Sequence, residues 1–260
     1  MNDIKIISYI DYSNQILFIN TMSLSLIIPV YNEFKQLDHT IKKLIKLKKK
    51  INCVDFIFID DFSTDDSYEK INSYCKKKSY IKLVRNNKKG LGSAIEVGIR
   101  RSKLNYICIF MCDMSDDIKD VITYYRLISS TKNDAILGTR FSKQSVVKNY
   151  PVLKFFLNRL FNNFLKIIFL SNYNDFTNAF KIYKRKTLLK LLPIVSENFN
   201  VFLEIPLKII TRKYKYKIIS INWTGRKHGE SKFKIKEIGS LYIFTLLYCL
   251  LEKILLNKYK

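Results

Sequence analysis

The segment Tyr106–Asp117, YICIFMCDMSDD, constrains the fold most, because within it an apolar run changes into a cluster of acids. The run from Ile107 to Met111 has the length of a buried strand, and a buried strand needs cover on both faces. Carboxylates that follow such a strand lie at its carboxyl end, where open α/β sheets bind ligands. Taken alone, the segment equally fits a strand followed by a helix that Ser115 caps and that has Asp117 in its first turn.

The same change from apolar run to polar residues recurs along the first half of the chain. Strands, each followed by a polar or helical stretch, are predicted over Leu24–Val30, Val54–Ile59, Ile81–Val84, Tyr106–Met111 and Ala135–Leu137. Alternating strands and helices predict a mostly parallel sheet with right-handed crossovers. The predicted fold class is therefore α/β, with helices flanking the sheet.

The second half of the chain is richer in long apolar stretches. Helices are predicted over Tyr150–Leu170 and Phe202–Arg212, and Tyr216–Trp223 alternates as a single strand does. The tail from Leu241 to Leu256 is almost wholly apolar and would extend roughly 24 Å as a helix, against a hydrocarbon core of about 30 Å. A spanning helix and a helix that lies on the membrane or docks on the domain both remain open.

Three parts are expected along the chain. Residues 1–22 form an N-terminal extension without the basic start and long apolar segment of a signal peptide. Residues 23–235 form the α/β domain. Residues 236–260 form an apolar or amphipathic C-terminal helix that associates with a membrane.

Composition limits the partners and the compartment. The net charge of +24 attracts polyanions, and the hydrophobic content of 48% excludes global disorder. Five cysteines without a Cys-x-x-Cys motif indicate reduced thiols and a cytosolic setting.

The segment Asn86–Ala94 is a basic, glycine-bearing loop that opens a helix. Backbone amides at a helix N-terminus, together with Lys89, suit a phosphate group. Gly90 and Gly92 fit a tight turn without a ligand equally well, and the GLGSA sequence alone is too weak for a dinucleotide motif.

Seven blocks of the sequence, in order, resemble a known family. The blocks PVYNE (29–33), Asp60-Asp61, KGLGSA (89–94), the strand that ends at Asp113 and GTRF (138–141) resemble family-2 glycosyltransferases of the GT-A fold. The blocks DFTNAFKIYKR (175–185) and RKHGESKF (226–233) are similar to the dolichyl/polyprenyl-phosphate mannosyltransferase branch. The resemblance covers about residues 24–233 and implies transfer of a sugar from a nucleotide-diphosphate sugar, on this branch to a polyprenyl phosphate such as a dolichyl or undecaprenyl phosphate.

The resemblance also implies roles for individual residues. The nucleotide pocket would be lined by the first block, Asp60 and Asp61 would hold the base and ribose, and Arg140 would contact phosphate and act in catalysis. The full set of expected nucleotide-sugar contacts is Pro29, Tyr31, Glu33, Asp60, Asp61, Lys89, Gly90, Arg226 and Lys232. Arg226 and Lys232 fit a solvated hairpin as well.

The metal site departs from the family pattern. Asp113 matches the second Asp of the Asp-x-Asp motif, but Met111 stands in place of the first, and a thioether is a poor ligand for Mg²⁺ or Mn²⁺. Three explanations stay open. Asp113 holds a metal that is bound to the donor diphosphate, helped by Ser115, Asp116 or Asp117; or lysines and arginines neutralise the diphosphate with little metal; or the chain is an inactive relative.

The acceptor decides whether a base is needed. A phosphate monoester is already ionised at pH 7, since its second pKa is about 6, so a lipid phosphate needs none. A saccharide hydroxyl does, and the candidates are Asp175 and Glu204. Alternatively, Asp175 caps the following helix and Glu204 pairs with Arg212 or Lys208. Arg159 either binds acceptor phosphate or extends its charged end to solvent from an aromatic helix.

The expected partners are a nucleotide-diphosphate sugar, a polyprenyl phosphate and a membrane surface on the cytoplasmic side, with a membrane-protein partner left open and no nucleic acid. One alternative is transfer to a saccharide in surface polysaccharide synthesis. Another is a non-catalytic, basic binder of membrane or nucleic acid, in which aromatic side chains stack on bases. The aromatic residues gather in apolar helices rather than between basic residues, which disfavours base stacking.

Overall fold

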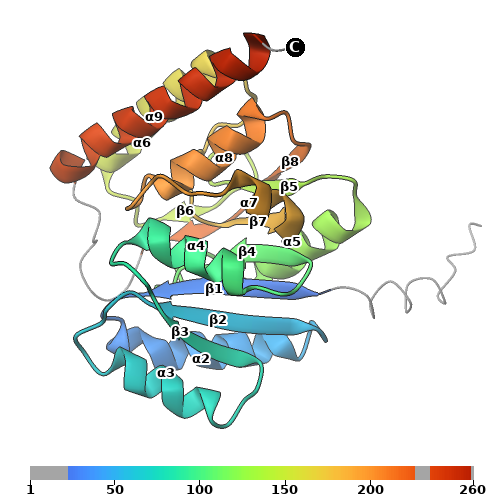
Figure 1. Ribbon diagram of the computed structural model, residues 1–260, viewed down its shortest axis with the longest axis vertical. Coiled ribbons are helices and arrows are strands. Elements are labelled where there is room, and N and C mark those ends of the chain that lie inside the picture. The colour runs from blue at the N-terminus through green and yellow to red at the C-terminus, as the bar shows by residue number, and fades with distance from the viewer. Residues whose placement is uncertain (1–22, 226–234, 259–260) are drawn as a thin grey trace, which may run out of the picture.

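The computed structural model describes residues 23–225 and 235–258, so the predicted extension 1–22 lies outside the described residues. A seven-stranded sheet forms its centre (Figure 1). In spatial order its strands are β3 (Ile81–Arg85), β2 (Val54–Asp60), β1 (Leu24–Val30), β4 (Tyr106–Ile109), β7 (Lys181–Lys184), β5 (Ala135–Thr139) and β8 (Tyr216–Ser220). Only β7 runs antiparallel to its neighbours in this sheet. The predicted mostly parallel α/β sheet is thus confirmed.

Eight helices of the described residues surround the sheet. They are α2 (Phe34–Lys48), α3 (Ser67–Cys75), α4 (Leu91–Arg101), α5 (Ile118–Ser130), α6 (Val152–Ile168), α7 (Arg185–Leu191), α8 (Val201–Thr211) and α9 (Ile235–Lys258). Apolar residues at helical spacing explain the inward faces, as Leu37, Ile41 and Leu44 of α2 are fully buried. The cap of α5 is Asp117, whose carboxylate accepts the Lys119 N–H at 2.9 Å, so the expectation that Ser115 is the cap was wrong.

The strands bury both faces against different helices. On β1, Leu26 and Ile28 point toward α2 and α5, whereas Ile27 points toward α4. Helices α2, α3 and α5 therefore cover one face of the sheet, and α4, α7 and α8 cover the other. Helices α6 and α9 form an outer layer beyond α8 (Figure 1).

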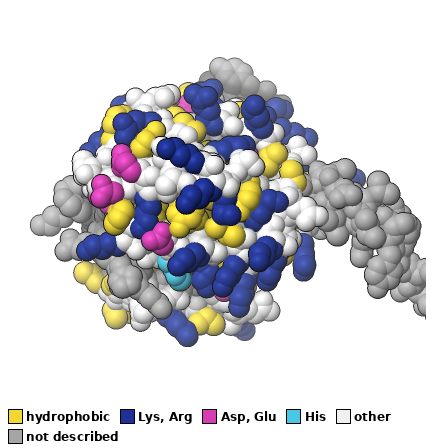
Figure 2. All heavy atoms as spheres, turned by 90° about the horizontal axis from the view of Figure 1, so that it is seen from below, with side chains coloured by type: hydrophobic (Ala, Val, Ile, Leu, Met, Phe, Trp, Pro, Cys, Tyr) yellow, Lys and Arg dark blue, Asp and Glu magenta, His cyan; other side chains and the backbone are white. Residues whose placement is uncertain are grey.

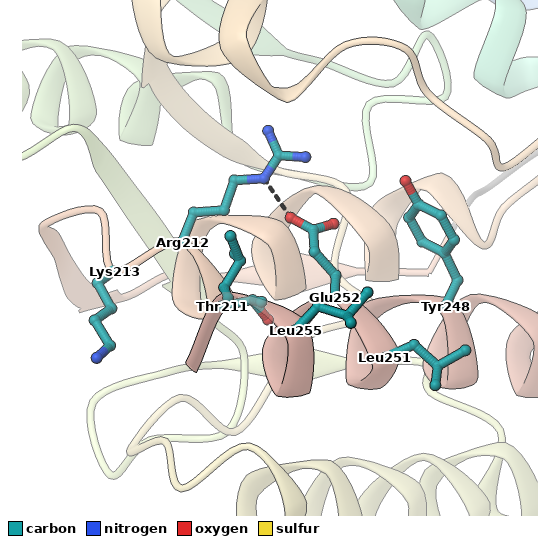
Figure 3. Close-up of a pocket in the computed structure, with 8 residues that line it drawn as sticks. Thr211, Arg212, Lys213, Tyr248, Leu251, Glu252 and Leu255 are labelled. Atoms are coloured by element: carbon teal, nitrogen blue, oxygen red, sulfur yellow. Dashed lines mark hydrogen bonds and ion pairs between the residues drawn. The ribbon is translucent and has the colours of Figure 1, made fainter. Parts of the chain in front are cut away.

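Helix α9 docks on α8 and α6 through buried side chains such as Leu246 and Cys249 and through Glu252 and Lys253. Glu252 accepts from Arg212 at 2.5 Å, and both residues line a cavity of about 780 Å³ at the end of α8 (Figure 3). Lys253 Nζ donates to the Ile168 carbonyl of α6 at 3.0 Å. The stretch 239–256 is also long and apolar enough to cross a membrane by length and composition.

Two elements differ from the predictions. The expected strand Tyr216–Trp223 is split, because after Ile221 the chain leaves β5 and pairs with another segment. There β9 (Trp223–Thr224) and β6 (Val147–Lys148) form a small parallel sheet. Helix α7 follows β7 without a turn and was not predicted.

Candidate functional site

One edge of the sheet collects the polar segments that the sequence singled out. The carboxyl ends of β1, β2, β4 and β5 meet there because these strands are parallel. Since β7 is antiparallel, its beginning lies at the same edge, and the turn 175–180 that enters it sits between Asp113 and Arg140. The antiparallel direction of β7 thus brings the turn 175–180 to the same edge as Asp113 and Arg140.

The predicted nucleotide-binding residues after β1, β2 and β3 form a tight cluster. Asp61 Oδ1 accepts the Gly90 N–H at 2.8 Å and the Asn86 side-chain N–H at 2.7 Å. The Lys89 ammonium lies 4.9 Å from the centre of the Tyr31 ring. The structure therefore places four of the predicted residues side by side, on the strand ends where a nucleotide is expected.

The neighbouring residues are held by the chain itself. Asp60 is fully buried, with Arg85 Nε at 3.5 Å from its Oδ2. Glu33 follows β1 in a loop whose backbone N–H donates to the Ser67 hydroxyl at 2.9 Å. Pro29 is buried within β1, which continues to pair with β2 there after its pairing with β4 has ended. These contacts fix the walls of the cluster before any ligand binds.

Backbone conformation and packing explain why positions 90 and 92 of the basic loop are glycines. Gly90 has φ +137°, a conformation that L side chains rarely adopt. A Cβ on Gly92 would lie 1.7 Å from the Ser196 carbonyl oxygen, and the Gly92 N–H donates to the Glu197 carbonyl at 2.9 Å. The loop thus packs directly against residues 196–197, which is a structural requirement beside any role in binding phosphate.

A cavity of about 630 Å³ opens beyond the end of β4. Its polar end is formed by Asp113, Ser115, Asp116 and Arg140, with the Met111 thioether beside them. Its walls come from the β6–β9 region, α6 and α9, and include Asn149, Tyr150, Lys154, Leu157, Asn158, Phe161, Trp223, Tyr242 and Ile243. A polar strand end and two apolar helices therefore share one cavity.

The two carboxylates of the cavity differ in environment. Asp113 is partly exposed, and its Oδ1 accepts the Ser115 N–H at 3.1 Å. Asp116 is 5% exposed, and its Oδ1 has no hydrogen-bond partner among the described residues. Burial raises the pKa of Asp116 to about 8, and the nearby charge of Asp113 adds to the rise. Asp116 is therefore distinguished by its burial, by its unpartnered oxygen and by its raised pKa.

Arg140 and Asp175 form a buried, bidentate ion pair. Arg140 Nε donates to Asp175 Oδ2 at 2.9 Å and a terminal nitrogen donates to Oδ1 at 2.7 Å. Burial opposes the charge of Arg140, but Asp175 outweighs burial and raises its pKa. Asp175 is fully buried and braces Arg140 rather than capping a helix.

The other predicted acceptor residues are also engaged. Glu204 is fully buried and lies 2.5 Å from Lys208, as the structural alternative expected, and it accepts the Ser196 N–H at 2.7 Å. Arg159 donates to the Asn174 carbonyl at 2.9 Å and lies 4.3 Å from the centre of the Phe141 ring. Neither Glu204 nor Arg159 lines the cavity in the part of the chain that the structure describes.

Some predicted residues lie apart, and others were missed. Arg226 and Lys232 lie outside the described residues. The sequence did not single out Lys181, which is buried and donates to the Phe176 and Asn178 carbonyls, with its pKa lowered by burial to about 7. A lysine that begins a buried strand is the only signal that would have found it.

Three comparisons place the chain among known proteins. The family model described as "Glycosyl transferase family 2" matches residues 25–192. The dolichol-phosphate mannosyltransferase of Pyrococcus furiosus is 26% identical over 225 residues, covering 84% of this chain and 61% of the relative. The chondroitin synthase of Escherichia coli is 33% identical over 132 residues, covering 50% of this chain and 19% of the relative. The chain therefore spans less than two thirds of the length of these curated relatives.

Solved structures show the same fold. Glucosyl-3-phosphoglycerate synthase from Mycobacterium tuberculosis, in complex with phosphoglyceric acid, has a TM-score of 0.68 and 15% identity, covering 90% of this chain and 82% of that one. The same enzyme was solved with Mn²⁺, UDP and phosphoglyceric acid (TM-score 0.68, 15% identity, 90% and 80% covered). At this identity the likeness carries the fold alone, and it confirms the predicted GT-A architecture.

Proposed function

This chain belongs to glycosyl transferase family 2, and we propose that it transfers a sugar from a nucleotide-diphosphate sugar to a polyprenyl phosphate at the cytoplasmic face of a membrane. The similarity to a dolichol-phosphate mannosyltransferase supports this class of acceptor. Family membership alone does not determine the acceptor, because enzymes that share one fold act on many different acceptors.

The cavity carries the proposal. Its polar end holds Asp113 and Arg140, and its walls continue into Leu157 and Phe161 of α6 and into Ile243 of α9. A polyprenyl phosphate has the same polarity, with one anionic end and a long apolar chain. The cavity therefore fits a lipid whose phosphate enters the polar end, beside Arg140 and the ion that Asp113 would hold, while its chain follows the two helices.

The outer surface of α6 and α9 suits a bilayer. Leu160 and Ile167 of α6 are each 72% exposed, and Leu251 of α9 is 60% exposed. Phe161 and Tyr242 hold the two helices side by side, with ring centres 5.8 Å apart. The apolar surface comprises Val152, Leu153, Phe156, Leu157, Leu160, Phe164, Ile167, Ile243, Phe244, Leu247, Leu251, Ile254 and Leu255. A patch of this kind marks an interaction site, and its continuity with the cavity favours lipid as the occupant.

Many Lys and Arg side chains gather on a different face from the apolar surface of α6 and α9. Figure 2 shows a face with many Lys and Arg side chains and few acids, over α2 and α3. Figure 1 places that face at the opposite end of the molecule from α6 and α9. The proposed membrane contact consequently depends on apolar side chains. The net charge of the chain does not predict which face of the protein meets the membrane.

The reaction requires little proton chemistry from the protein. A phosphate oxygen of the acceptor forms a bond to the anomeric carbon, and the bond from that carbon to the donor diphosphate breaks. The attacking oxygen is already ionised at pH 7, so no base is needed. This agrees with the geometry, because Asp175 and Glu204 are both held in buried ion pairs. The task of the cavity is to position two anions and to exclude water.

A divalent cation fits the polar end of the cavity. Carboxylate and hydroxyl oxygens of Asp113 and Ser115 are the hard ligands that Mg²⁺ or Mn²⁺ prefers, whereas the Met111 thioether is not. When bound there, such an ion stabilises the negative charge on the leaving diphosphate. Within residues 23–225 and 235–258, no three His, Cys, Asp or Glu side chains are grouped as a complete metal site, so donor phosphates would complete the coordination.

Transfer into lipid tests the acceptor. The purified chain is incubated with labelled UDP- or GDP-sugars, Mn²⁺ and dolichyl or undecaprenyl phosphate, with Asp113→Ala as the inactive control. We expect label in the organic phase for at least one donor. Label that appears only in water-soluble glycan would reject the lipid phosphate as acceptor.

Vesicle binding tests the membrane surface. The double variant Leu160→Glu/Ile167→Glu lowers the net charge by two on α6, and Lys43→Ala/Lys46→Ala lowers it by two on α2. Sedimentation with vesicles of phosphatidylcholine and phosphatidylglycerol should show at least about tenfold weaker binding for the α6 variant, because burial of apolar area is lost. A larger loss for the α2 variant would show that the basic face contacts the membrane instead.

A further inference from the structure

The loop that follows β4 contains a buried carboxylate, that of Asp116, with one oxygen that has no hydrogen-bond partner in the described chain. We propose that Asp116, together with Asp113, binds the divalent cation of this site and takes the place of the carboxylate that is absent at position 111. The inference rests on the proposed function, since it assumes a donor diphosphate that shares the ion. It assigns the second protein ligand, which the family pattern would put elsewhere.

Asp116 has the position that a ligand needs. It lines the cavity beside Met111, Asp113 and Ser115 and is 5% exposed. Its Oδ1 accepts no hydrogen bond from the residues that the structure describes. A buried carboxylate oxygen without a partner is costly, and a cation shared with Asp113 would satisfy it.

The neighbouring acids have other contacts. Asp117 Oδ1 accepts the Lys119 N–H at 2.9 Å as the cap of α5. Asp120, in the first turn of α5, accepts the Asn222 N–H at 3.3 Å with its Oδ2. Neither of them lines the cavity as described, so Asp116 is the member of this acidic run that accompanies Asp113.

The nearby cations do not pair with Asp116. Arg140 donates to Asp175 from Nε and from one terminal nitrogen. The Lys181 ammonium donates to backbone carbonyls, among them that of Phe176 at 3.1 Å. Arg140 and Lys181, the two cationic groups near Asp116, are thus bound to other partners. The Asp116 carboxylate therefore remains available to an ion.

The loop is fixed where the ion would bind. Asp116 forms an isolated antiparallel β-bridge with Trp223, and the Ser115 carbonyl accepts the Thr224 N–H at 2.9 Å. Met114 has φ +56°, a left-handed turn between the two carboxylates. This turn and the contact with β9 hold Asp116 against the cavity, so the site is preformed rather than assembled by the ligand.

Binding of Mn²⁺ tests the assignment without any sugar transfer. Mn²⁺ is titrated into the full chain alone and with UDP or GDP, and bound ion is read from loss of the electron paramagnetic resonance signal of free Mn²⁺, with protein-free nucleotide as reference. We expect Asp116→Asn to weaken binding at least about tenfold. The matched control Asp117→Asn, which keeps an oxygen to cap α5, should bind within about twofold of wild type.

A rescue distinguishes a ligand from a structural carboxylate. In Met111→Asp/Asp116→Asn a carboxylate returns to the cavity at position 111, and Mn²⁺ affinity should recover at least about threefold over Asp116→Asn. Wild-type affinity in Asp116→Asn, absence of rescue in the double variant, or no Mn²⁺ retained by wild type in any titration would each overturn the assignment. Transfer into lipid with no Mn²⁺ binding would reject the inference alone, and Mn²⁺ binding through Asp116 without transfer would reject the proposed function alone.

Discussion

Two strands of this sheet end in acids, and the two acidic ends are built differently. After β2, Asp61 accepts hydrogen bonds from Gly90 and Asn86, and the buried Asp60, whose Oδ2 also lacks a hydrogen-bond donor in the described chain, has Arg85 at 3.5 Å. After β4, Asp113 accepts one from Ser115, while Asp116 is buried with an oxygen that lacks a donor in the described chain. The sequence pattern is the same at both places, and the surroundings are not.

The difference separates two kinds of task. A carboxylate that is bonded to its own loop shapes a pocket, because its position no longer depends on a ligand. Asp116 is buried beside another acid and forms no ion pair within the described chain, so its carboxylate remains available to an external partner. On this view the β2 end positions the nucleotide and the β4 end binds charge.

The largest effect on stability is expected at the buried Arg140–Asp175 ion pair, beside the carboxyl end of β4. Asp175→Ala leaves Arg140 buried without its partner and should lower the free energy of unfolding by about 3–5 kcal/mol. Urea unfolding measures it. Asp38→Ala is the control, since its pair with Lys70 is half exposed and should cost less than about 1 kcal/mol. Equal losses in the two variants would mean that the Arg140–Asp175 pair gives no special support to the cavity.

The next effect concerns catalysis. Asp113→Ala should reduce sugar transfer at least about 100-fold, because the charge on the leaving diphosphate loses its stabilising ion, while the thermal midpoint stays within about 2 °C. Initial rates with the active donor measure the first quantity and thermal unfolding the second. A variant that retains the wild-type rate would remove Asp113 from the site.

A smaller loss is expected at the β2 end. Asp61→Ala removes the acceptor for the Gly90 and Asn86 N–H groups and should cost about 1–3 kcal/mol of unfolding free energy. Asp61→Asn keeps one acceptor oxygen and should cost less. If instead both variants are as stable as wild type but bind no nucleotide, Asp61 serves the ligand alone, and the contrast between the two ends disappears.

The smallest effect tests position 111 directly. Met111→Asp should be tolerated and should lower the Mn²⁺ concentration for half-maximal transfer by about threefold, since an oxygen ligand replaces a thioether. The Mn²⁺ dependence of the initial rate measures it. An unchanged Mn²⁺ response would mean that position 111 does not face the ion.

Much of the fold could be predicted because it is encoded locally. The apolar runs before Asp60 and Asp113 have strand length and end at polar residues, so strands, helices and the binding edge follow from neighbouring residues. The family blocks added the nucleotide cluster, which the structure assembles around Asp61 and Gly90. The strands and helices depend on contacts within single βα units, whereas the nucleotide cluster joins neighbouring units.

The rest could not be predicted because it depends on contacts between distant segments. The partner of Arg140 is Asp175, and their contact requires that β7 runs antiparallel between β4 and β5. Whether Ser115, Asp116 or Asp117 faces the cavity depends on the turn at Met114 and on β9, far along the chain. No local pattern contains that information.

The position of β7 also affects how the chain folds during synthesis. Strand β5 has only β7 and β8 as neighbours in the sheet, although it precedes both in the sequence. When residues 24–139 have emerged from a ribosome, strands β1 to β4 can already pair, but β5 has no partner and the outer edge of β4 is open. Such an edge is a template for pairing with other chains. The forty or so residues that lead to β7 therefore mark the interval in which a nascent chain is most exposed to aggregation.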